Sequence, residues 1–270
     1  MLEVNNITKQ LPNGKQLLKG ISFSVDKGEF VGILGPSGAG KTLTMKCLNG
    51  LLKPSSGNVN ITLPNKGQID IAKIGRKELK NIRKHIGVIF QGFNLVKRLT
   101  ALENVMIGKL GQINVFRSLF YGFTDHEAGL AMETLKKVKM ESMAHRKVET
   151  MSGGEMQRIA IARAMFQEPV MFIADEPIAN LDPSNAKSIM KLLKPLSETM
   201  PVIGVFHQPE IIMEYCTRVI AIKDGKVFYD GDPKMSSSLL YQIYEDEFNS
   251  IISPKTIPVP EETVFDYQIS

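Results

Sequence analysis

The chain has 270 residues, of which 43% are hydrophobic and 23% charged, and these proportions are typical of a globular protein and exclude a collagen-like or disordered chain. The net charge of +5 is compatible with nucleic acid, anionic lipid or phosphorylated ligands and chooses none of them. Two cysteines are too few for a disulfide framework, and the lack of a leader or of about 18 consecutive apolar residues predicts a soluble chain whose membrane role needs partners.

The first part of the chain predicts two strands, a glycine-rich loop and a helix in direct succession. Apolar residues alternate with serines over 21–25, which is the period of a half-buried strand, and EFVGIL at 29–34 indicates a buried strand. GPSGAGKT at 35–42 follows, and then a helical segment that ends at Gly50. A strand, a glycine loop and a helix are therefore expected in this order.

The middle of the chain predicts short strands, a basic helix face and further helices. Residues 54–75 are rich in turn residues, and HIGVIF at 85–90 indicates a buried strand. Thr124 and Glu127 have the spacing of a capping box, so a helix is predicted after Thr124. The most basic stretch of the chain is 73–84, and we interpret it as a solvated helix face because it contains no aromatic residue that could stack on a nucleic-acid base. Its charged residues are Lys73, Arg76, Lys77, Glu78, Lys80, Arg83 and Lys84.

The last third of the chain predicts two more buried strands, a capped helix and a hairpin. The apolar runs at 170–174 and 202–206 indicate the strands, and Asp182 followed by proline is typical of a helix start. Asp224-Gly225 is a strong hairpin-turn signal. We therefore predict an α/β core with a mostly parallel sheet and antiparallel additions, and a tail after residue 248 because of its prolines and lack of helical period.

The glycine-rich loop has the spacing GxxxxGK[ST] of a phosphate-binding loop. Its glycines allow backbone N–H groups to surround phosphate oxygens, and the helix N-terminus adds a partial positive charge. We expect Lys41 to reach the β- and γ-phosphates of a nucleotide and the Thr42 hydroxyl to bind Mg²⁺. The residues of this candidate site are Gly35, Pro36, Ser37, Gly38, Ala39, Gly40, Lys41 and Thr42.

Two acidic residues follow the strand at 170–174. A carboxylate at the C-terminal edge of a strand, here Asp175, is suited to hold Mg²⁺ beside the phosphate loop, and Glu176 to polarise an attacking water. Taken alone, an Asp-Glu-Pro triplet more often indicates a solvated turn. Its position behind a buried strand and downstream of a phosphate loop favours the functional interpretation.

A second anion site is predicted at 152–155, where two glycines open a helix and leave backbone N–H groups exposed at its positive end. On its own this segment mostly indicates a helix cap. Gln91 and His207 each follow a predicted strand, and all these features together are hard to obtain by chance. The residues of the second anion site are Ser152, Gly153, Gly154 and Glu155.

With these motifs in this order, the chain resembles the ATP-binding subunits of ABC transporters over about residues 2–246. The matching motifs are the Walker A loop (35–42), the Q-loop glutamine (Gln91), the signature (151–158), the Walker B strand (170–175), the catalytic glutamate (Glu176), the D-loop (179–182) and the switch histidine (His207). The resemblance implies a P-loop NTPase core with a helical subdomain at about 92–165 and a tail at 247–270. It implies ATP as substrate, Mg²⁺ held by Thr42, Gln91 and Asp175, catalysis by Glu176, His207 and Gln91, and a D-loop contact by Asp182.

The resemblance also implies partners. In that family two subunits enclose two ATP molecules, and each signature helix caps the γ-phosphate held by the other subunit, so a homodimer is expected. Integral-membrane permease subunits and, indirectly, a periplasmic or lipid-anchored solute-binding protein are implied, and no nucleic acid. The chain is then expected to be peripheral on the cytoplasmic face of the cell membrane.

Some segments are more specific than the family. Residues 90–111, 117–123 and 175–183 are similar to the ATPase of bacterial phosphonate importers, a branch that includes phosphite systems, and predict uptake of phosphonates or related phosphorus oxyanions. Four aromatic residues are expected either to line a docking groove for the permease's coupling helices or to form a plain core cluster; they are Phe116, Phe120, Tyr121 and Phe123.

Three departures and two alternatives qualify this interpretation. Leu11 stands where the family usually has an aromatic residue that stacks on adenine, which predicts weaker adenine affinity or selectivity. Glu155 replaces a commoner glutamine, and residues 205–209 differ from the usual pattern around the switch histidine. The first alternative is an ATPase of another membrane complex, for another solute or for lipid and envelope machinery. The second is a non-transport ABC ATPase: a DNA-associated or translation ATPase usually carries coiled-coil insertions or a second cassette that this chain lacks, and a regulatory switch with little turnover is disfavoured by the presence of Glu176 and His207.

Overall fold

The computed structural model describes residues 1–64, 66–113 and 122–252, with the backbone alone for 246–252. Its strands are β1 (Leu2–Gln10), β2 (Gln16–Val25), β3 (Phe30–Leu34), β4 (Ser56–Leu63), β5 (Gly67–Asp70), β6 (Ile86–Ile89), β7 (Met171–Asp175), β8 (Val202–Val205), β9 (Arg218–Lys223) and β10 (Lys226–Gly231). Its helices are α1 (Lys41–Leu48), α2 (Arg76–Arg83), α3 (Ala101–Ile107), α5 (Asp125–Lys137), α6 (Gly153–Phe166), α7 (Pro183–Leu193), α8 (Pro209–Tyr215) and α9 (Ser237–Ile252). Short 3₁₀ helices cover Glu141–Met143, Val148–Thr150 and Lys194–Glu198.

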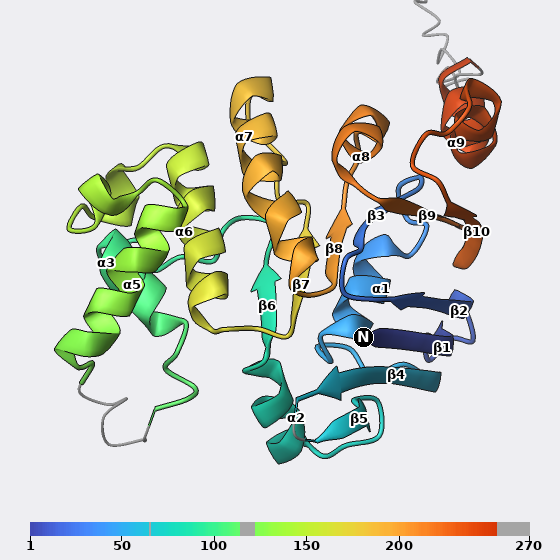
Figure 1. Cartoon of the computed structure of the whole chain (residues 1–270). Helices are drawn as coiled ribbons and strands as arrows, with labels where there is room; N and C mark the ends of the chain where they lie inside the picture. The colour runs from blue at the N-terminus through green and yellow to red at the C-terminus, as the bar shows by residue number, and fades with distance from the viewer. Residues whose placement is uncertain (65, 114–121, 253–270) are drawn as a thin grey trace, which may run out of the picture.

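The strands form two sheets (Figure 1). The larger sheet has the order β10-β9-β3-β8-β7-β6, in which β3 pairs in parallel with β8 and β9, and β7 pairs in parallel with β6 and β8. Only β10 runs antiparallel, because a tight turn joins it to β9. The smaller sheet, β2-β1-β4-β5, is antiparallel throughout. The predicted α/β core with antiparallel additions is confirmed.

The larger sheet separates two hydrophobic cores, because successive side chains of a strand point to opposite faces. On β3, Phe30 and Leu34 join the core under α6, α7 and α8, whereas Val31 and Ile33 join the core shared by α1 and the smaller sheet. Figure 1 shows α7 and α8 on one face of the strands and α1 behind them. Both faces are therefore covered, as a parallel sheet requires.

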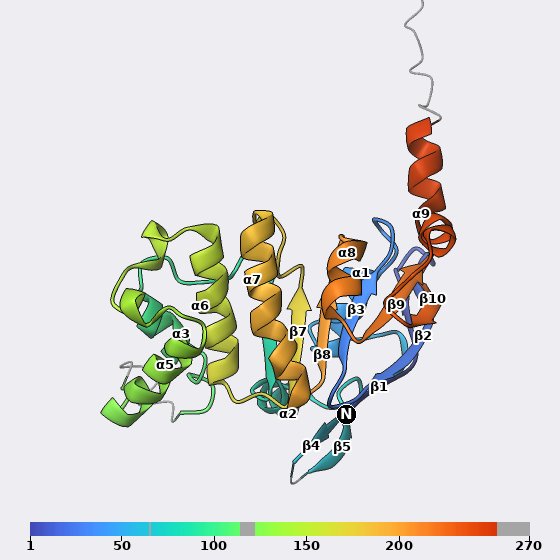
Figure 2. The same ribbon diagram turned by 45° about the horizontal axis from the view of Figure 1, so that its top comes forward.

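Helices α3, α5 and α6 form a separate group beside the β6 edge of the larger sheet (Figures 1 and 2). Each begins with a capping box, in which the side chain of the N-cap residue accepts from the backbone N–H of a glutamate three residues later. The carboxylate of that glutamate accepts in turn from the backbone N–H of the N-cap residue; the three N-cap residues are Thr100, Thr124 and Ser152. The predicted box at Thr124 is confirmed. The predicted limits of a helical subdomain, 92–165, remain a prediction.

Some residues named in the predictions lie outside the part of the chain that the structure describes. Phe116, Phe120 and Tyr121 lie outside them, whereas Phe123 is half-buried. Helix α9 continues to Ile252 and points away from the sheets (Figure 2), so helical backbone extends into the segment expected as a tail. Across the described ranges, none of the helices combines the length and apolar character that a membrane crossing needs.

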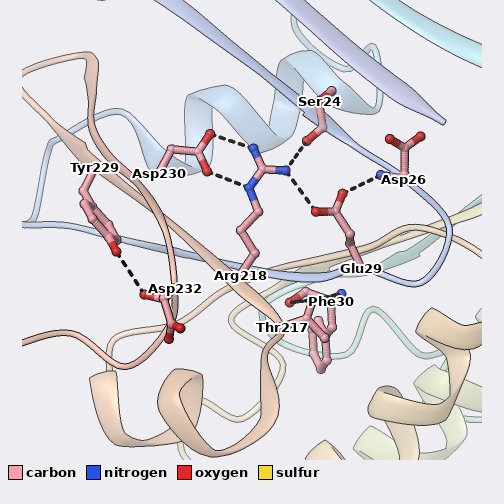
Figure 3. Close-up of polar contacts among 9 residues, drawn as sticks. All are labelled: Ser24, Asp26, Glu29, Phe30, Thr217, Arg218, Tyr229, Asp230 and Asp232. Carbon is pink, nitrogen blue, oxygen red and sulfur yellow. Dashed lines mark hydrogen bonds and ion pairs between the residues drawn. The ribbon is translucent and has the colours of Figure 1, made fainter.

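Arg218, the first residue of β9, joins three segments of the fold (Figure 3). Its guanidinium donates to both carboxylate oxygens of Asp230, at 2.6 and 2.7 Å, and to Glu29 and the Ser24 carbonyl, each at 3.0 Å. Glu29 also accepts from the backbone N–H of Asp26 at 2.7 Å. The hydrogen bond to Asp230, followed by that to Glu29, raises the pKa of Arg218. This cluster ties β10 and β9 to the turn that leads into β3.

We expect Arg218→Met to lower the free energy of unfolding by about 2 kcal/mol, because Glu29 and Asp230 keep their half-buried positions and lose the guanidinium. Lys187→Met is the matched control, since its ammonium lies 4.0 Å from Glu214 and both side chains are more than half exposed. The control is expected to cost less than about 1 kcal/mol. Urea unfolding measures both variants, and equal losses would contradict the stabilising role of Arg218.

Candidate functional site

The phosphate-loop residues lie between β3 and α1, as predicted. Gly35 has a φ of +143°, and a Cβ there would come 1.9 Å from the carbonyl oxygen of Ile222, so only glycine fits. Lys41 is buried, and its Nζ donates to the carbonyl oxygens of Gly35 at 2.6 Å and Pro36 at 2.9 Å. Helix α1 begins at left-handed Gly40 with no side-chain cap, which leaves N–H groups at its positive end available to an anion.

The C-terminal edge of β7 brings two carboxylates to this loop. Glu176 and His207, with residues 37–43, line a cavity of about 260 Å³. Asp175 precedes Glu176, and its buried Oδ1 has no hydrogen-bond partner within the described residues. Burial, followed by the charge of Glu176, raises the pKa of Asp175. A desolvated carboxylate beside a phosphate loop is a suitable ligand for a cation.

Glu176 connects two residues that are distant in sequence. Its Oε2 accepts a hydrogen bond of 2.9 Å from Nε2 of Gln91, at the end of the β6 segment, and its Oε1 lies 2.8 Å from Nε2 of His207, after β8. The backbone at Glu176 is left-handed, with a φ of +51°, which is uncommon for a residue other than glycine. Strained backbone of this kind gathers at functional sites, and here it turns Glu176 toward the cavity.

The predicted second anion site lies at the start of α6. Ser152 is the N-cap, and Glu155 accepts from its backbone N–H at 2.7 Å, a bond that lowers the pKa of Glu155. Gly154 is close-packed, because a Cβ there would come 2.9 Å from the side chain of Asn185. That side chain donates to Oδ2 of Asp182 at 2.6 Å.

The structure therefore brings the predicted residues into two groups. Glu176 and His207 line the cavity with the phosphate loop, and Gln91 donates to Glu176. Residues 152–155 do not line that cavity, and Gly154 packs instead against Asn185, which donates to Asp182. Asp182 caps α7 as predicted, by accepting from the N–H groups of Ser184 and Asn185. Sequence reasoning missed Asn185, although its position three residues after an N-cap aspartate was a signal. Leu11 lies exposed beside the β1–β2 turn.

A groove of about 380 Å³ follows the edge strand β6, between α1, α2 and the helical group. Its apolar lining includes Leu51, Ile86, Val88, Phe90 and Ile107. Two arginines in it donate to backbone carbonyls rather than to carboxylates: Arg163 to Phe93 and Asn94, at 3.0 and 2.6 Å, and Arg83 to Asn49 and Gly50, at 3.1 and 2.5 Å. The groove thus combines an apolar floor with two positive charges.

The turn between β9 and β10 supports the phosphate loop from outside. Gly225 donates its N–H to the carbonyl of Ala39 at 3.1 Å, and its own carbonyl accepts from Lys19 at 2.8 Å. Its φ is +76°, and a Cβ there would come 2.5 Å from the carbonyl oxygen of Leu17. The predicted hairpin turn is confirmed, and its contact with the loop is a positioning role that the sequence did not indicate.

We expect Gly225→Ala to weaken nucleotide binding about tenfold, because a turn displaced from Leu17 no longer holds Ala39 by a hydrogen bond. Gly28→Ala is the matched control, because Gly28 also has a positive φ, +94°, but no heavy atom lies within 4 Å of the added Cβ. The control therefore introduces the backbone strain of a left-handed alanine without a steric clash. Calorimetric titration with ATP and urea unfolding separate the effects. Unaltered ATP affinity in Gly225→Ala would remove the positioning role.

The chain is similar to known ATP-binding proteins over most of its length. A family model described as ABC transporter matches residues 18–179. The phosphonates import ATP-binding protein PhnC of Lactococcus lactis subsp. cremoris (strain SK11) is 36% identical over 250 residues, 92% of this chain and 100% of the relative. The protein of the same name from Mesoplasma florum is 37% identical over 247 residues, 90% of this chain and 99% of the relative. A solved dimeric structure of the ATP-binding cassette MJ0796, in a post-hydrolysis state with ADP and Pi, is 34% identical with a TM-score of 0.72 and covers 87% of this chain and 100% of that chain.

Proposed function

The chain belongs to the ABC transporter family as an ATP-binding subunit, and from that premise we propose that it hydrolyses ATP to import phosphonates or related phosphorus oxyanions through a separate permease. The single observation that supports the ATPase part is the cavity in which Glu176 faces the phosphate loop. The single observation that supports the substrate is the similarity to phosphonate import proteins over nearly the whole chain.

In this proposal the phosphate loop binds the nucleotide. Lys41 exchanges the carbonyls of Gly35 and Pro36 for the β- and γ-phosphates, so its ammonium is already held at the mouth of the loop before the nucleotide arrives. The N–H groups of residues 35–40 and the start of α1 add donors that are fixed in place. Stabilising the charge on the transferring phosphoryl group then needs little rearrangement.

Glu176 is the proposed base, with His207 and Gln91 as the residues that orient it. One carboxylate oxygen contacts each partner, so the carboxylate is aligned from both sides. Glu176 accepts a proton from the attacking water, and His207 keeps the carboxylate directed at the cavity. The reaction depends on in-line placement of that water more than on covalent chemistry.

The residues present fit Mg²⁺. Asp175 offers a buried oxygen that has no partner among the described residues, and Thr42 is exposed at the start of α1. We propose that Thr42, Gln91 and Asp175 hold the ion, which when bound neutralises phosphate charge. Gln91 donates to Glu176 through Nε2, so the oxygen of the same amide would be the atom that binds the ion.

The second anion site is proposed to act on the nucleotide of another copy of this chain. Residues 152–155 form the N-terminus of α6, whose capping box uses the N–H groups of Ser152 and Glu155, and they do not line the phosphate-loop cavity of their own chain, which supports a site completed across a homodimer. Asn185 and Asp182 hold this N-terminus against α7. The MJ0796 cassette, solved as a dimer, adds support for that arrangement.

The groove along β6 is the proposed contact with the permease. Phe90 lines it and directly precedes Gln91, so a helix seated in the groove would act on the Gln91–Glu176 hydrogen bond through one peptide unit. A periplasmic or lipid-anchored solute-binding protein would deliver the solute to that permease. The chain would then lie on the cytoplasmic face of the cell membrane.

The substrate is tested by reconstituting the chain with its own permease and solute-binding protein in proteoliposomes. ATP hydrolysis is measured with an alkylphosphonate, phosphite, phosphate or an amino acid on the binding-protein side. We expect stimulation by the alkylphosphonate or phosphite and none by the amino acid. ATP hydrolysis that no phosphorus oxyanion stimulates would remove the proposed substrate and leave the ATPase in place.

A further inference from the structure

Helix α2 carries a basic stripe, formed by Arg76, Lys77, Lys80, Arg83 and Lys84. These positions follow the spacing of three, four and seven residues that places side chains on one face of a helix. The opposite face is apolar: Ile82 is fully buried, and Leu79 packs against Gly50. The helix is therefore anchored to the protein by one face and presents cations on the other.

The charge of the basic stripe is not neutralised by the protein. Within the part of the chain that the structure describes, Arg76, Lys77 and Lys80 form no ion pair, and all three are exposed. Glu78 is the one acidic residue on α2. Asp70, on the neighbouring strand β5, is committed to Lys73 at 3.2 Å and to two backbone N–H groups. The cations of Arg76, Lys77 and Lys80 are thus available to an external anion.

The basic stripe is continuous with the groove along β6. Arg83, at the end of α2, lines the groove, and the next residue, Lys84, has methylene carbons 3.6 Å from the position of a Cβ at Gly111. Figure 1 shows α2 beside the start of β6. A permease bound in the groove would place α2, which borders the groove, on the side of the protein that faces the bilayer. In this one respect the inference rests on the proposed function.

We propose that the basic stripe of α2 contacts anionic lipid headgroups of the membrane around the permease. Arg76, Lys77 and Lys80 line none of the cavities described above, so they fit a diffuse anionic surface better than a single bound molecule. Single-stranded nucleic acid is less suited, because no aromatic residue on α2 offers a base-stacking surface. Clusters of basic residues on one helix face are the pattern by which peripheral proteins bind anionic lipids.

The test is vesicle binding by the full chain. Wild-type protein is sedimented with vesicles of phosphatidylcholine alone or of phosphatidylcholine mixed with phosphatidylglycerol, at rising salt. The test variant is Arg76→Gln/Lys77→Gln/Lys80→Gln. The matched control, Lys136→Gln/Lys137→Gln/Lys191→Gln, removes the same charge from exposed positions of α5 and α7.

We expect wild type and control to bind the phosphatidylglycerol vesicles, with binding lost as salt rises, and the test variant to bind about a hundredfold more weakly. Equal binding by the test variant, or equal binding to phosphatidylcholine alone, would overturn the proposal. Tighter binding to a DNA duplex than to vesicles, lost in the same variant, would assign the stripe to nucleic acid instead. ATP hydrolysis by the isolated chain is unchanged in both variants; a wild-type chain with no hydrolysis contradicts the proposed function and leaves vesicle binding as a separate result.

Discussion

Glu176→Gln is expected to lower the rate of ATP hydrolysis by about 10²- to 10⁴-fold while ATP binding stays near that of the wild type. The amide keeps the size of the side chain and one acceptor oxygen for the hydrogen bond from Gln91, but it cannot accept a proton from water. The phosphate loop and Lys41 are unchanged, so the variant should still bind ATP. Steady-state phosphate release measures the rate, and equilibrium binding of a fluorescent ATP analogue measures the affinity.

The same variant tests whether the second anion site works across a dimer. ATP that is bound but not cleaved should hold two chains together, which size-exclusion chromatography with light scattering would detect. Glu198→Gln removes the same charge at an exposed position outside the site and is expected to behave as the wild type. Phosphate release by Glu176→Gln within twofold of the control would mean that another group accepts the proton.

Lys41→Ala is expected to weaken ATP binding by roughly 10- to 100-fold, because hydrogen bonds to charged groups contribute about 1.5–3 kcal/mol. Without nucleotide the variant should be as stable as the wild type or more so. In the wild type Lys41 is buried and its ammonium donates to two backbone carbonyl oxygens, so removing the charge relieves its desolvation. A thermal shift assay with and without ATP would show an unchanged or raised midpoint and the loss of stabilisation by ATP.

Lys136→Ala, on the exposed face of α5, is the control for this second variant and should keep the full stabilisation by ATP. A Lys41→Ala protein that unfolds at a lower temperature without nucleotide would show that the ammonium has a structural role in the empty loop. An unchanged shift with ATP would mean that the backbone N–H groups bind the phosphates unaided.

The two variants separate the two halves of the site. In the proposed function Lys41 acts on the nucleotide whether or not the reaction proceeds, and Glu176 acts only when water attacks. The hydrogen bond from Gln91 to Glu176 links the groove to the cavity. Phe90 lines the groove, and the next residue, Gln91, contacts Glu176 in the cavity. We propose this hydrogen bond as the route by which a partner bound in the groove changes the position of the carboxylate.

Local patterns in the sequence determined most elements of this protein. The helix after Thr124 and the turn at Asp224-Gly225 depend on residues within four positions of one another, so their signals survive without knowledge of the fold. The phosphate loop belongs here as well, because its glycines are required by backbone geometry, as the φ of +143° at Gly35 illustrates. Buried strands were recognisable because both faces of a parallel sheet are covered.

Only the tertiary structure decided which of these elements meet. Gln91 and Glu176 are 85 residues apart and come together because β6 and β7 are neighbours in the sheet, and no local period carries that strand order. The same reason explains why the support of Ala39 by Gly225 and the packing of Asn185 on Gly154 were not foreseen. The groove is a further case, since its walls come from the segment after α1 and from α2, β6, α3 and α6. A surface assembled from distant segments is created by their packing and not by any one of them.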